Sequence, residues 1–285
     1  MDISIIILNY NDGDRTAQLV KKIKSYVLFD HIVVVDNKSS DNSLEILLPL
    51  RDAVTDVISA KSNGGYACGN NFGILHALKS YTTDIIFIAN PDVSFPEDTA
   101  MQMVKALKEN PGCGIVAPLV NQGYNAWKLP DFAGVLMSLF LIAFNLHKRN
   151  IRKNILSSDR EVVPVGVVEG SFFAISSKAY KAARGFDERT FLYSEEVIMA
   201  QRLRRAGYGE AVLRDFFYDH LHSASIKKIY HSSKAKAFPH FRDSFRIYNR
   251  YYLHTNPLQD RIFNISYAAA LVERHIYDRI NKLLP

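Results

Sequence analysis

Cysteine is scarce in this sequence, and several other signals that would fix the class of protein at once are missing. Cys68 and Cys113 are far apart and have no cysteine or histidine at a zinc-binding spacing beside them. The longest apolar segments fall short of the roughly 20 residues that a membrane-spanning helix needs. The amino terminus shows no secretory signal pattern, because the chain starts directly with a predicted strand. We therefore expect a globular, cytoplasmic protein without a disulfide framework.

The composition that is present can fill a large core. Of the 285 residues, 48% are hydrophobic and 22% are charged, as in a single large domain or a domain with an appendage. The formal net charge of +6 is modest. It fits a partner that carries phosphate, which could be a nucleotide, an anionic membrane or, with less support, nucleic acid.

A buried strand that ends in two polar side chains is the centre of the predicted fold. Residues 85–89 are all apolar, and Asn90-Pro91-Asp92 follows them directly. Proline has no N–H to donate, so the strand should end there and present Asn90 and Asp92 at its carboxyl end. In an open α/β sheet, ligands bind at this edge. Asp92 is therefore a candidate ligand for a metal or for the phosphate side of a substrate; an ordinary turn with a solvated aspartate is the alternative.

The first part of the chain has the spacing of a strand–helix–strand unit. We expect strands over 3–8 and 32–35, a helix over 15–26 and a second helix from about Ser43, which predicts a parallel sheet. The turn after the first strand lacks the glycine pattern of a dinucleotide site. Asp36, at the end of the second strand, could accept a hydrogen bond from a base or ribose, or could serve as a turn residue.

A glycine-rich stretch over 63–74 precedes the central strand. It contains Gly64, Gly65, Gly69 and Gly73, which permit positive φ and close backbone approach. We expect a loop here, followed by a helix from about Asn70 to Ser80. This loop could form one wall of a nucleotide or sugar site.

These segments together resemble the family 2 glycosyltransferases, above all the bacterial rhamnosyltransferase-like and capsule or O-antigen members. The resemblance is carried by Asn9-Tyr10-Asn11, residues 34–43, residues 63–74 and Asn90-Pro91-Asp92. It implies the GT-A fold, an α/β fold with a Rossmann-like, mostly parallel sheet flanked by helices. The implied domain covers 1–230, with a nucleotide-sugar half over 1–118 and an acceptor half over 119–230. A helical extension over 231–285 would follow.

The resemblance also implies a donor site and a divalent cation, Mg²⁺ or Mn²⁺. Asp36 would read the uracil or thymine base, and Asp92 would match the metal-binding aspartate of the family's D-x-D motif, with Asn90 in place of the first aspartate. The implied donor-binding residues are Asn9, Tyr10, Asn11, Asp36, Asn63, Gly65, Gly69, Asn71, Asn90 and Asp92.

The second half offers a candidate base. We expect a strand over 162–168, a helix over 178–183 capped by Ser176 or Ser177, and a helix from Ser194 to Ala206 that stops at Gly207. Glu195 and Glu196 would lie in the first turn of that last helix, where acidic residues also stabilise the helix through its dipole. By resemblance, Glu196 is the first choice as general base and Glu195 the second. Glutamate replaces the family's aspartate here, and Ile198 stands where another acid is frequent.

Two histidines complete the predicted metal site. If residues 219–225 are extended, His220 and His222 point to the same side and could form a metal pair. Surface histidines in a loop are the alternative. By resemblance His220, five residues before Ser225, is the first choice and His222 the second, so that the implied metal ligands are Asp92, His220 and His222.

Two segments relate to membranes. Residues 133–146 are strongly apolar and precede a basic run over 147–153, so they could lie in a membrane interface or form a core helix with a solvated basic loop. The tail over 238–285 mixes aromatic and basic residues and should end in a helix over 258–284. Its apolar residues at helical spacing suit a packing, dimer or membrane-docking element; they are Ile262, Ile265, Ala269, Val272, Ile276 and Ile280.

The expected function is that of an inverting glycosyltransferase in cell-surface polysaccharide synthesis. It would move a sugar from dTDP-rhamnose or a UDP-sugar to a saccharide acceptor, with a lipid-linked acceptor favoured, in the cytoplasm or on the inner face of the plasma membrane. A homodimer fits the same reading, and a nucleic-acid partner is not expected. The alternative functions are a nucleotide-sugar-binding protein that has lost catalysis and a membrane-associated scaffold.

Overall fold

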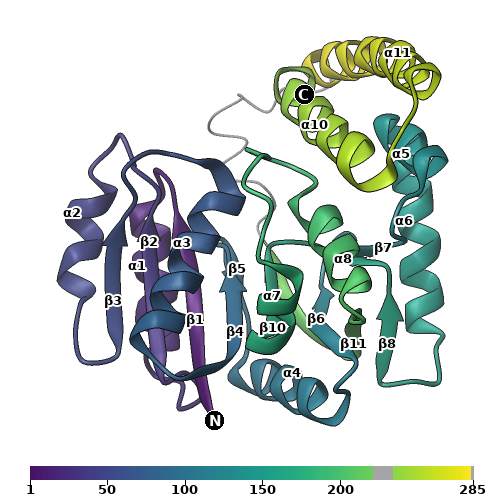
Figure 1. The fold of residues 1–285 in the computed structure, drawn as a ribbon. Coiled ribbons are helices and arrows are strands. Elements are labelled where there is room, and N and C mark those ends of the chain that lie inside the picture. Colours follow the sequence, from purple (N-terminus) through teal and green to yellow (C-terminus); the bar gives the residue numbers. More distant parts are fainter. Residues whose placement is uncertain (221–233, 284–285) are drawn as a thin grey trace.

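A mixed β-sheet forms the centre of the molecule (Figure 1). The computed structural model describes residues 1–220 and 234–283. The strands of the main sheet are β1 (Asp2–Asn9), β2 (His31–Asp36), β3 (Thr55–Ser59), β4 (Thr83–Ala89), β5 (Val93–Ser94), β6 (Cys113–Val120), β8 (Val162–Val165), β10 (Phe172–Ser176) and β11 (Gly209–His220). Their order is β3-β2-β1-β4-β10-β6-β11-β5, with β8 also paired to β11.

The amino-terminal half of the sheet is parallel. β3, β2, β1 and β4 run in one direction, and β6 and β11 also pair in parallel. β10 is antiparallel to both β4 and β6, so it joins the two parallel groups. The expected α/β architecture with a mostly parallel sheet is confirmed. Because β1, β2 and β4 are parallel neighbours, their carboxyl ends meet at one edge of the sheet.

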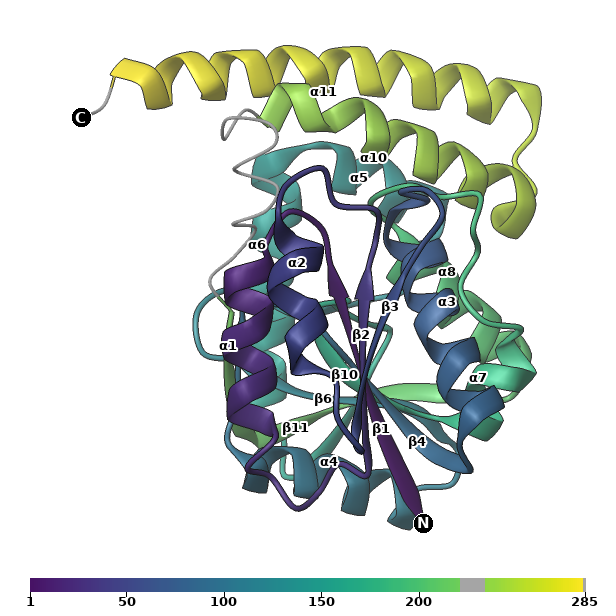
Figure 2. The same ribbon diagram turned by 90° about the vertical axis from the view of Figure 1, so that its left-hand side faces the viewer.

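Helices cover both faces of this sheet (Figure 2). Those that pack on one face are α1 (Gly13–Ile23), α2 (Ser43–Leu47), the short 3₁₀ helix Leu48–Leu50 and α4 (Glu97–Glu109). Those on the other face are α3 (Gly65–Ser80), α7 (Ser177–Ala183) and α8 (Glu195–Arg205). β1 contributes to the cores on both faces of the sheet. Ile5 and Ile7 pack in the first core cluster, which lies under α1, α2 and α4, and Ile6 packs in the second, which lies under α3, α7 and α8.

A third core cluster ties the carboxyl-terminal helices to the sheet. The elements around it are β7 (Ala126–Trp127), β9 (Val167–Val168), α5 (Phe132–Leu139), α6 (Leu141–Leu156), α10 (Lys234–Tyr248), the π-helical turn Asn249–Leu253 and α11 (Pro257–Leu283). Trp127, Val135 and Ile198 meet Tyr248 and Phe263 in this cluster. α11 lies across α10 and α5 in Figure 2, and it contacts both helices.

The glycine-rich stretch is the main departure from the expected secondary structure. α3 begins at Gly65 instead of about Asn70, so most of the expected loop is wrong, and Gly65, Gly69 and Gly73 are helical. A Cβ at Gly69 would clash with Leu8, and one at Gly73 would clash with Ile6 and Val35. The glycines therefore let α3 lie close against β1 and β2, a tertiary reason that overrides their low helix propensity.

Other boundaries differ by less. α1 covers Gly13–Ile23 instead of 15–26, and the strand expected over 162–168 is interrupted at Gly166 between β8 and β9. Ser176 caps α7 by accepting a hydrogen bond from the Ala179 N–H, as one of the two expected serines should. The helices expected from Ser43 and over 258–284 are present as α2 and α11.

The apolar segment and its basic neighbours form two helices. Residues 133–146 are divided at Phe140 between α5 and α6, and Val135 and Leu139 are completely buried in the third cluster. The basic residues after them continue α6, so the solvated basic loop expected there is wrong. Among the described residues, we find no helix with the length and apolar content needed to cross a bilayer.

Candidate active site

The ends of β1 and β2 are bound together by buried polar side chains. The Asn9 amide donates to Asp36 Oδ1 and to Ser39 Oγ, both at 3.0 Å, and Asn9 Oδ1 accepts from the Thr16 hydroxyl at 2.9 Å. The second Asp36 oxygen accepts from the Ser39 N–H at 3.2 Å. Asn9 is fully buried and Asp36 is 1% exposed. Asn9 thus orients Asp36, and each carboxylate oxygen of Asp36 keeps one lone pair for another donor.

The residues after Asn9 bind the turn that follows Asp36. Asn11 has a positive φ of 55°. Its N–H donates to Ser39 Oγ at 3.0 Å, and its Oδ1 accepts from the Ser40 N–H at 2.8 Å. Tyr10, between Asn9 and Asn11, is partly exposed. The predicted residues Asn9, Tyr10, Asn11 and Asp36 are therefore brought together at one sheet edge.

The start of α3 supports the opposite half of the molecule. Gly65 has φ +83°, and a Cβ on it would clash with the Phe191 backbone, whose carbonyl accepts from the Tyr66 N–H at 3.1 Å. The Tyr66 hydroxyl donates to the Gly170 carbonyl. Asn63 Oδ1 fixes this start by accepting from the Gly65 N–H at 3.0 Å. Gly65 and Asn63 thus hold the segment that leads into α8.

Two predicted donor-binding residues of α3 are used in packing. The Asn71 side chain bonds Phe186 through both its oxygen and its nitrogen, and its nitrogen also donates to Glu188 at 2.8 Å. Gly69 faces Leu8. Gly69 also lies against Asn37, the residue after Asp36. Asn71 and Gly69 thus both help to pack α3, and their role in donor binding stays a prediction.

Asp92 and His220 are neighbours. β5 pairs with the end of β11, with His220 opposite Val93, and His220 Nε2 lies 3.3 Å from Asp92 Oδ1. Both side chains are less than one-tenth exposed. Burial opposes protonation of His220, but the Asp92 carboxylate outweighs this effect and raises the pKa of the imidazole. Asn90 is anchored beside them, where its N–H donates to the Ser171 carbonyl at 2.8 Å.

The other predicted metal ligand cannot be placed. His222 lies outside the described residues, as does Ser225. Within residues 1–220 and 234–283 there is no cluster of three or more acidic, histidine or cysteine side chains suited to a metal ion. A cation at this place would therefore have Asp92 and His220 as its described protein ligands.

Glu195 and Glu196 open α8 after a strained turn. Tyr193 and Ser194 have φ values of +72° and +65°, so two successive non-glycine residues are left-handed. Such residues typically cost about 1–3 kcal/mol each and are concentrated at functional sites. The Ser194 hydroxyl makes no capping bond, although the Ile198 N–H bonds its carbonyl at 3.0 Å. Consecutive residues of a helix point about 100° apart, so the two carboxylates have different surroundings: Glu195 is 3% exposed, whereas Glu196 lines a cavity.

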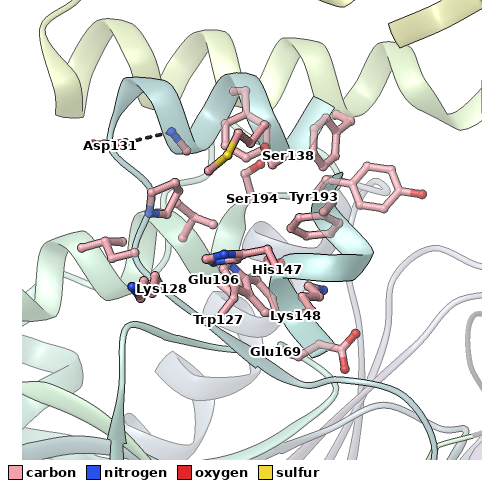
Figure 3. A pocket seen from close by; sticks show the side chains of 18 residues that line it. Trp127, Lys128, Asp131, Ser138, His147, Lys148, Glu169, Tyr193, Ser194 and Glu196 are labelled. Atoms are coloured by element: carbon pink, nitrogen blue, oxygen red, sulfur yellow. Dashed lines mark hydrogen bonds between the residues drawn. The ribbon is translucent and has the colours of Figure 1, made fainter. Parts of the chain in front are cut away.

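That cavity lies between α5, α6, α8 and α10 (Figure 3). Its volume is about 410 Å³, and much of its wall is apolar, including Trp127, Phe144 and Phe245. Lys148 lies over two of these rings, with Nζ 4.0 Å from the Trp127 centroid and 4.3 Å from that of Phe144. Glu196 adds a carboxylate to this wall. The cavity thus combines aromatic surface, the cations Lys128 and Lys148, and a candidate base.

Burial changes the acidity of the charged groups in the cavity. Burial, with a smaller contribution from the Glu169 charge, raises the pKa of Glu196 to about 7, although a backbone hydrogen bond and the Lys148 charge act in the opposite direction. Burial lowers the pKa of Lys148, while Glu169 and Glu196 oppose that shift. Glu195 is more strongly affected, because burial and then the Glu196 charge raise its pKa well above the usual value. Glu196 is therefore a carboxyl whose affinity for a proton suits a base near neutral pH.

Glu169 is a functional candidate that the sequence does not single out. It follows β9, lines the cavity beside Lys148 in Figure 3, and its charge acts on both His220 and Glu196. The same charge contributes to the raised pKa of Tyr66 and of Tyr218, although burial is the main cause in both. Glu169 therefore connects the Asp92–His220 pair electrostatically with the wall that carries Glu196. In the sequence, the only indication of a role for Glu169 is its position directly after a predicted strand.

The comparisons with known proteins agree on one family. The model of glycosyl transferase family 2 matches residues 4–182. The rhamnosyltransferase WbbL of Escherichia coli K12 is 24% identical over 276 residues, which cover 92% of this chain and 98% of that protein. The N-acetylglucosaminyl-diphospho-decaprenol L-rhamnosyltransferase of Mycobacterium tuberculosis is 26% identical over 192 residues, or 62% of each chain.

Solved structures with the same fold are also glycosyltransferases. The mannosyltransferase PcManGT from Pyrobaculum calidifontis, in complex with GDP-Man and Mn²⁺, superposes with a TM-score of 0.60 at 17% identity, covering 99% of this chain and 75% of its own. GalNAc-T7 with UDP, GalNAc and Mn²⁺ gives a TM-score of 0.59 at 14% identity, covering 77% of this chain and 44% of its own. These likenesses confirm the GT-A fold.

Proposed function

The chain belongs to glycosyl transferase family 2 and is therefore a sugar-transferring enzyme, and from this premise we propose which substrates it joins and how. The proposed donor is a nucleotide diphosphate sugar, with dTDP-rhamnose favoured by the names of the two relatives. The proposed acceptor is a lipid-linked saccharide. The proposed setting is the synthesis of a cell-surface polysaccharide.

Asp36 is proposed to bind the base of the donor. It stands at the carboxyl end of β2, and Asn9 and Ser39 hold its carboxylate in one orientation. The N3–H of uracil or thymine is a donor that a fixed carboxylate oxygen can accept. Tyr10, Asn11 and Asn90 lie at the same sheet edge and are proposed to bind the rest of the nucleotide.

Asp92 and His220 are proposed to hold a divalent cation. They offer a carboxylate oxygen and an imidazole nitrogen on adjacent buried side chains, a donor set that suits Mn²⁺ or Mg²⁺ completed by water and phosphate oxygens. Bound there, such an ion would offset the charge of the leaving nucleotide diphosphate.

Glu196 is proposed as the general base of a single inverting displacement. It would accept the proton of the acceptor hydroxyl as that oxygen attacks the anomeric carbon. The observation that carries this assignment is that Glu196 lines the cavity and has a pKa of about 7, whereas Glu195 is buried and does not line it. A carboxyl group at Glu196 that is placed to accept a proton favours an active enzyme over a nucleotide-sugar-binding protein that has lost catalysis.

The cavity itself is proposed as the acceptor site. Trp127 and Phe144 offer flat apolar surfaces on which a sugar ring or the first part of a lipid can pack. Lys148 would face the phosphate of a lipid-linked saccharide. The proposed division of the chain is a nucleotide-sugar half over 1–118, an acceptor half over 119–230 and a helical extension over 231–285.

The proposal is tested by combining donor binding with turnover. We expect dTDP-rhamnose, in a panel of nucleotide sugars, to raise the melting temperature more with Mn²⁺ than without it. Asp92→Asn should remove this dependence on Mn²⁺. Glu196→Gln should lower turnover by about 10²-fold or more, as loss of a general base does, while stabilisation by donor stays. Glu195→Gln is the matched control and should retain more activity.

Two results would contradict the proposal. Turnover at the wild-type rate in Glu196→Gln would reject the base. Absence of stabilisation by every nucleotide sugar, with and without metal, would reject the donor site at the carboxyl ends of β1, β2 and β4.

A further inference from the structure

α11 presents an apolar stripe to solvent that the packing of the molecule does not explain. Its members follow one another at intervals of three or four residues and are Ile262, Ile265, Ala269, Val272, Ile276 and Ile280. Ile265 is 71% exposed, Val272 58% and Ile276 53%. The residues that pack inward, Phe263 and Ala270, lie on a different face of the helix and are buried.

The stripe is long for an exposed surface. α11 has 27 residues, so it extends for about 40 Å at the rise of an α-helix. Single exposed apolar residues are normal, but a continuous apolar strip along a whole helix marks an interaction surface. Figure 2 shows α11 at the outer side of α10, where one of its faces remains uncovered within the described part of the chain.

The charges on α11 favour an anionic partner. Arg261 is four residues before Ile265, and Arg279 is three residues after Ile276, so both exposed guanidinium groups border the stripe. The acidic side chains of α11 accept hydrogen bonds within the molecule: Asp260 from the Thr255 hydroxyl, Glu273 from the Leu141 N–H and Asp278 from the Ala235 N–H. Arg261 and Arg279 therefore place two exposed positive charges at one border of the stripe, while the Glu273 carboxylate is turned to the start of α6.

A second copy of the chain fits this pattern less well. Two helices that share an apolar seam usually place opposite charges beside it. Here the acid nearest the stripe, Glu273, already accepts the N–H groups of Leu141 and Ile142 at the start of α6. Two borders that carry Arg261 and Arg279 would repel each other, whereas an anionic lipid surface would complement both.

We propose that α11 is an interfacial helix that docks the enzyme on an anionic bilayer, with its apolar stripe inserted among the lipids and Arg261 and Arg279 at the headgroups. α11 contacts α5 and α10, and these two helices contribute Met137 and Phe245 to the wall of the cavity that holds Glu196. Docking would therefore bring the cavity close to the lipid surface, which, resting on the function proposed above, is where a lipid-linked acceptor is found.

Vesicle flotation of the full chain tests this surface directly. We expect the wild-type protein to float with phosphatidylcholine vesicles that contain phosphatidylglycerol, and to bind pure phosphatidylcholine more weakly. The double substitution Ile265→Asn with Val272→Asn should reduce binding about tenfold or more, because it removes two apolar groups from the inserted face. The matched control is Val27→Asn with Leu75→Asn, two residues that are 91% and 57% exposed elsewhere; it should float like the wild type.

Other outcomes overturn the docking surface. Equal flotation of the stripe variant and the control would do so, and so would a wild-type protein that binds no anionic vesicle. Sedimentation without lipid gives a third criterion, since a dimer that the stripe variant dissociates would show that a second copy covers the stripe. Circular dichroism of both variants verifies that they are folded.

An activity assay separates this inference from the proposed function. The stripe variant should transfer sugar to a water-soluble, short-chain acceptor at the wild-type rate and should be slower only with acceptor embedded in vesicles. If the wild-type protein binds anionic vesicles but transfers no sugar to either acceptor, the docking surface stands and the proposed function fails. If it transfers sugar but does not bind vesicles, the docking surface fails alone.

Discussion

At the scale of single residues, the decisive features are the surroundings of a few charged groups. Glu196 and Glu195 are adjacent in sequence and chemically alike, but consecutive helical side chains point about 100° apart and only Glu196 lines the cavity. Lys148 is the cation whose charge most directly favours the ionised form of Glu196. The chemistry of the base therefore depends on a lysine that is 48 residues away in the sequence.

The pH dependence of turnover is the prediction that belongs to this scale. A base acts when it has lost its proton, so activity should fall as the pH drops through about 7, the pKa of Glu196. Lys148→Met removes a charge that lowers this pKa, and the acid limb of the pH–kcat profile should move to higher pH. Lys128→Met is the matched control, because Lys128 also lines the cavity but does not act on Glu196; its acid limb should stay in place. A limb unchanged in Lys148→Met would contradict the role of the lysine.

The sequence could predict residues at strand ends but not residues that depend on tertiary contacts. Asp36 and Asp92 each follow or end a strand that the sequence predicted, so their positions were predictable from local pattern. His220 was named from the resemblance, and β11, the strand that ends at it, was not predicted. Lys148 looked like one member of a basic run, and only the packing of α6 against Trp127 shows that it reaches the cavity. Glu169 and Asn71 likewise acquire their places from strand and helix pairings that connect distant segments.

At the scale of elements, hydrogen bonds fasten the carboxyl-terminal helices to the segment before α8. Tyr252 is buried, and its hydroxyl donates to Asp187 at 2.6 Å and accepts from Arg202 Nε at 2.8 Å. Arg202 also donates to the Gly185 carbonyl at 2.8 Å. This network joins the turn after α10 to the turn after α7, so the extension is bonded to the segment that leads to Glu196.

Removing one hydroxyl should measure this attachment. Tyr252→Phe leaves the ring in place but takes a partner from Asp187 and from Arg202, and should lower the free energy of unfolding by about 1–3 kcal/mol. Urea denaturation measures the change. Tyr251→Phe is the control: Tyr251 is 46% exposed and stacks on Arg189 through its ring, which phenylalanine keeps. An equal loss in both variants would show that the buried network adds nothing.

The error over 63–74 also belongs to the scale of elements. Glycines at this density usually indicate a loop, and local propensity offers no reason for a helix. The reason lies in the neighbours, since Ile6, Leu8 and Val35 leave room for a helix only where Cβ atoms are absent. By contrast, the extent of α11 was predictable from the local sequence, because its apolar residues recur at a regular helical spacing.

At the scale of the whole molecule, the extension shares a core with the catalytic part. Phe238, Tyr248 and Phe263 of the extension pack with Trp127 and Ile198 in the third cluster. Segments that share buried apolar surface lose it together when one of them unfolds. The proposed boundary at residue 231 therefore separates two parts of the sequence, but these parts are not independently stable units.

A single unfolding transition is the prediction at this scale. Trp127 is the only tryptophan of the sequence and lies in the third cluster, so its fluorescence reports on that cluster alone. Circular dichroism reports on the helices of the entire molecule. We expect both signals to give the same thermal midpoint. A fluorescence midpoint clearly below that of circular dichroism would show that the extension and its cluster melt separately.

The long strand β11 ends at the Asp92–His220 pair. It pairs with β6 and β8 along its first part and with β5 at His220. Its register with β6 shifts between Leu213 and Phe217, as at a β-bulge. Because a bulge bends a strand and turns the side chains beyond it, this irregularity sets the direction in which His220 reaches Asp92, and a one-residue insertion or deletion there would turn His220 to the other face of the strand.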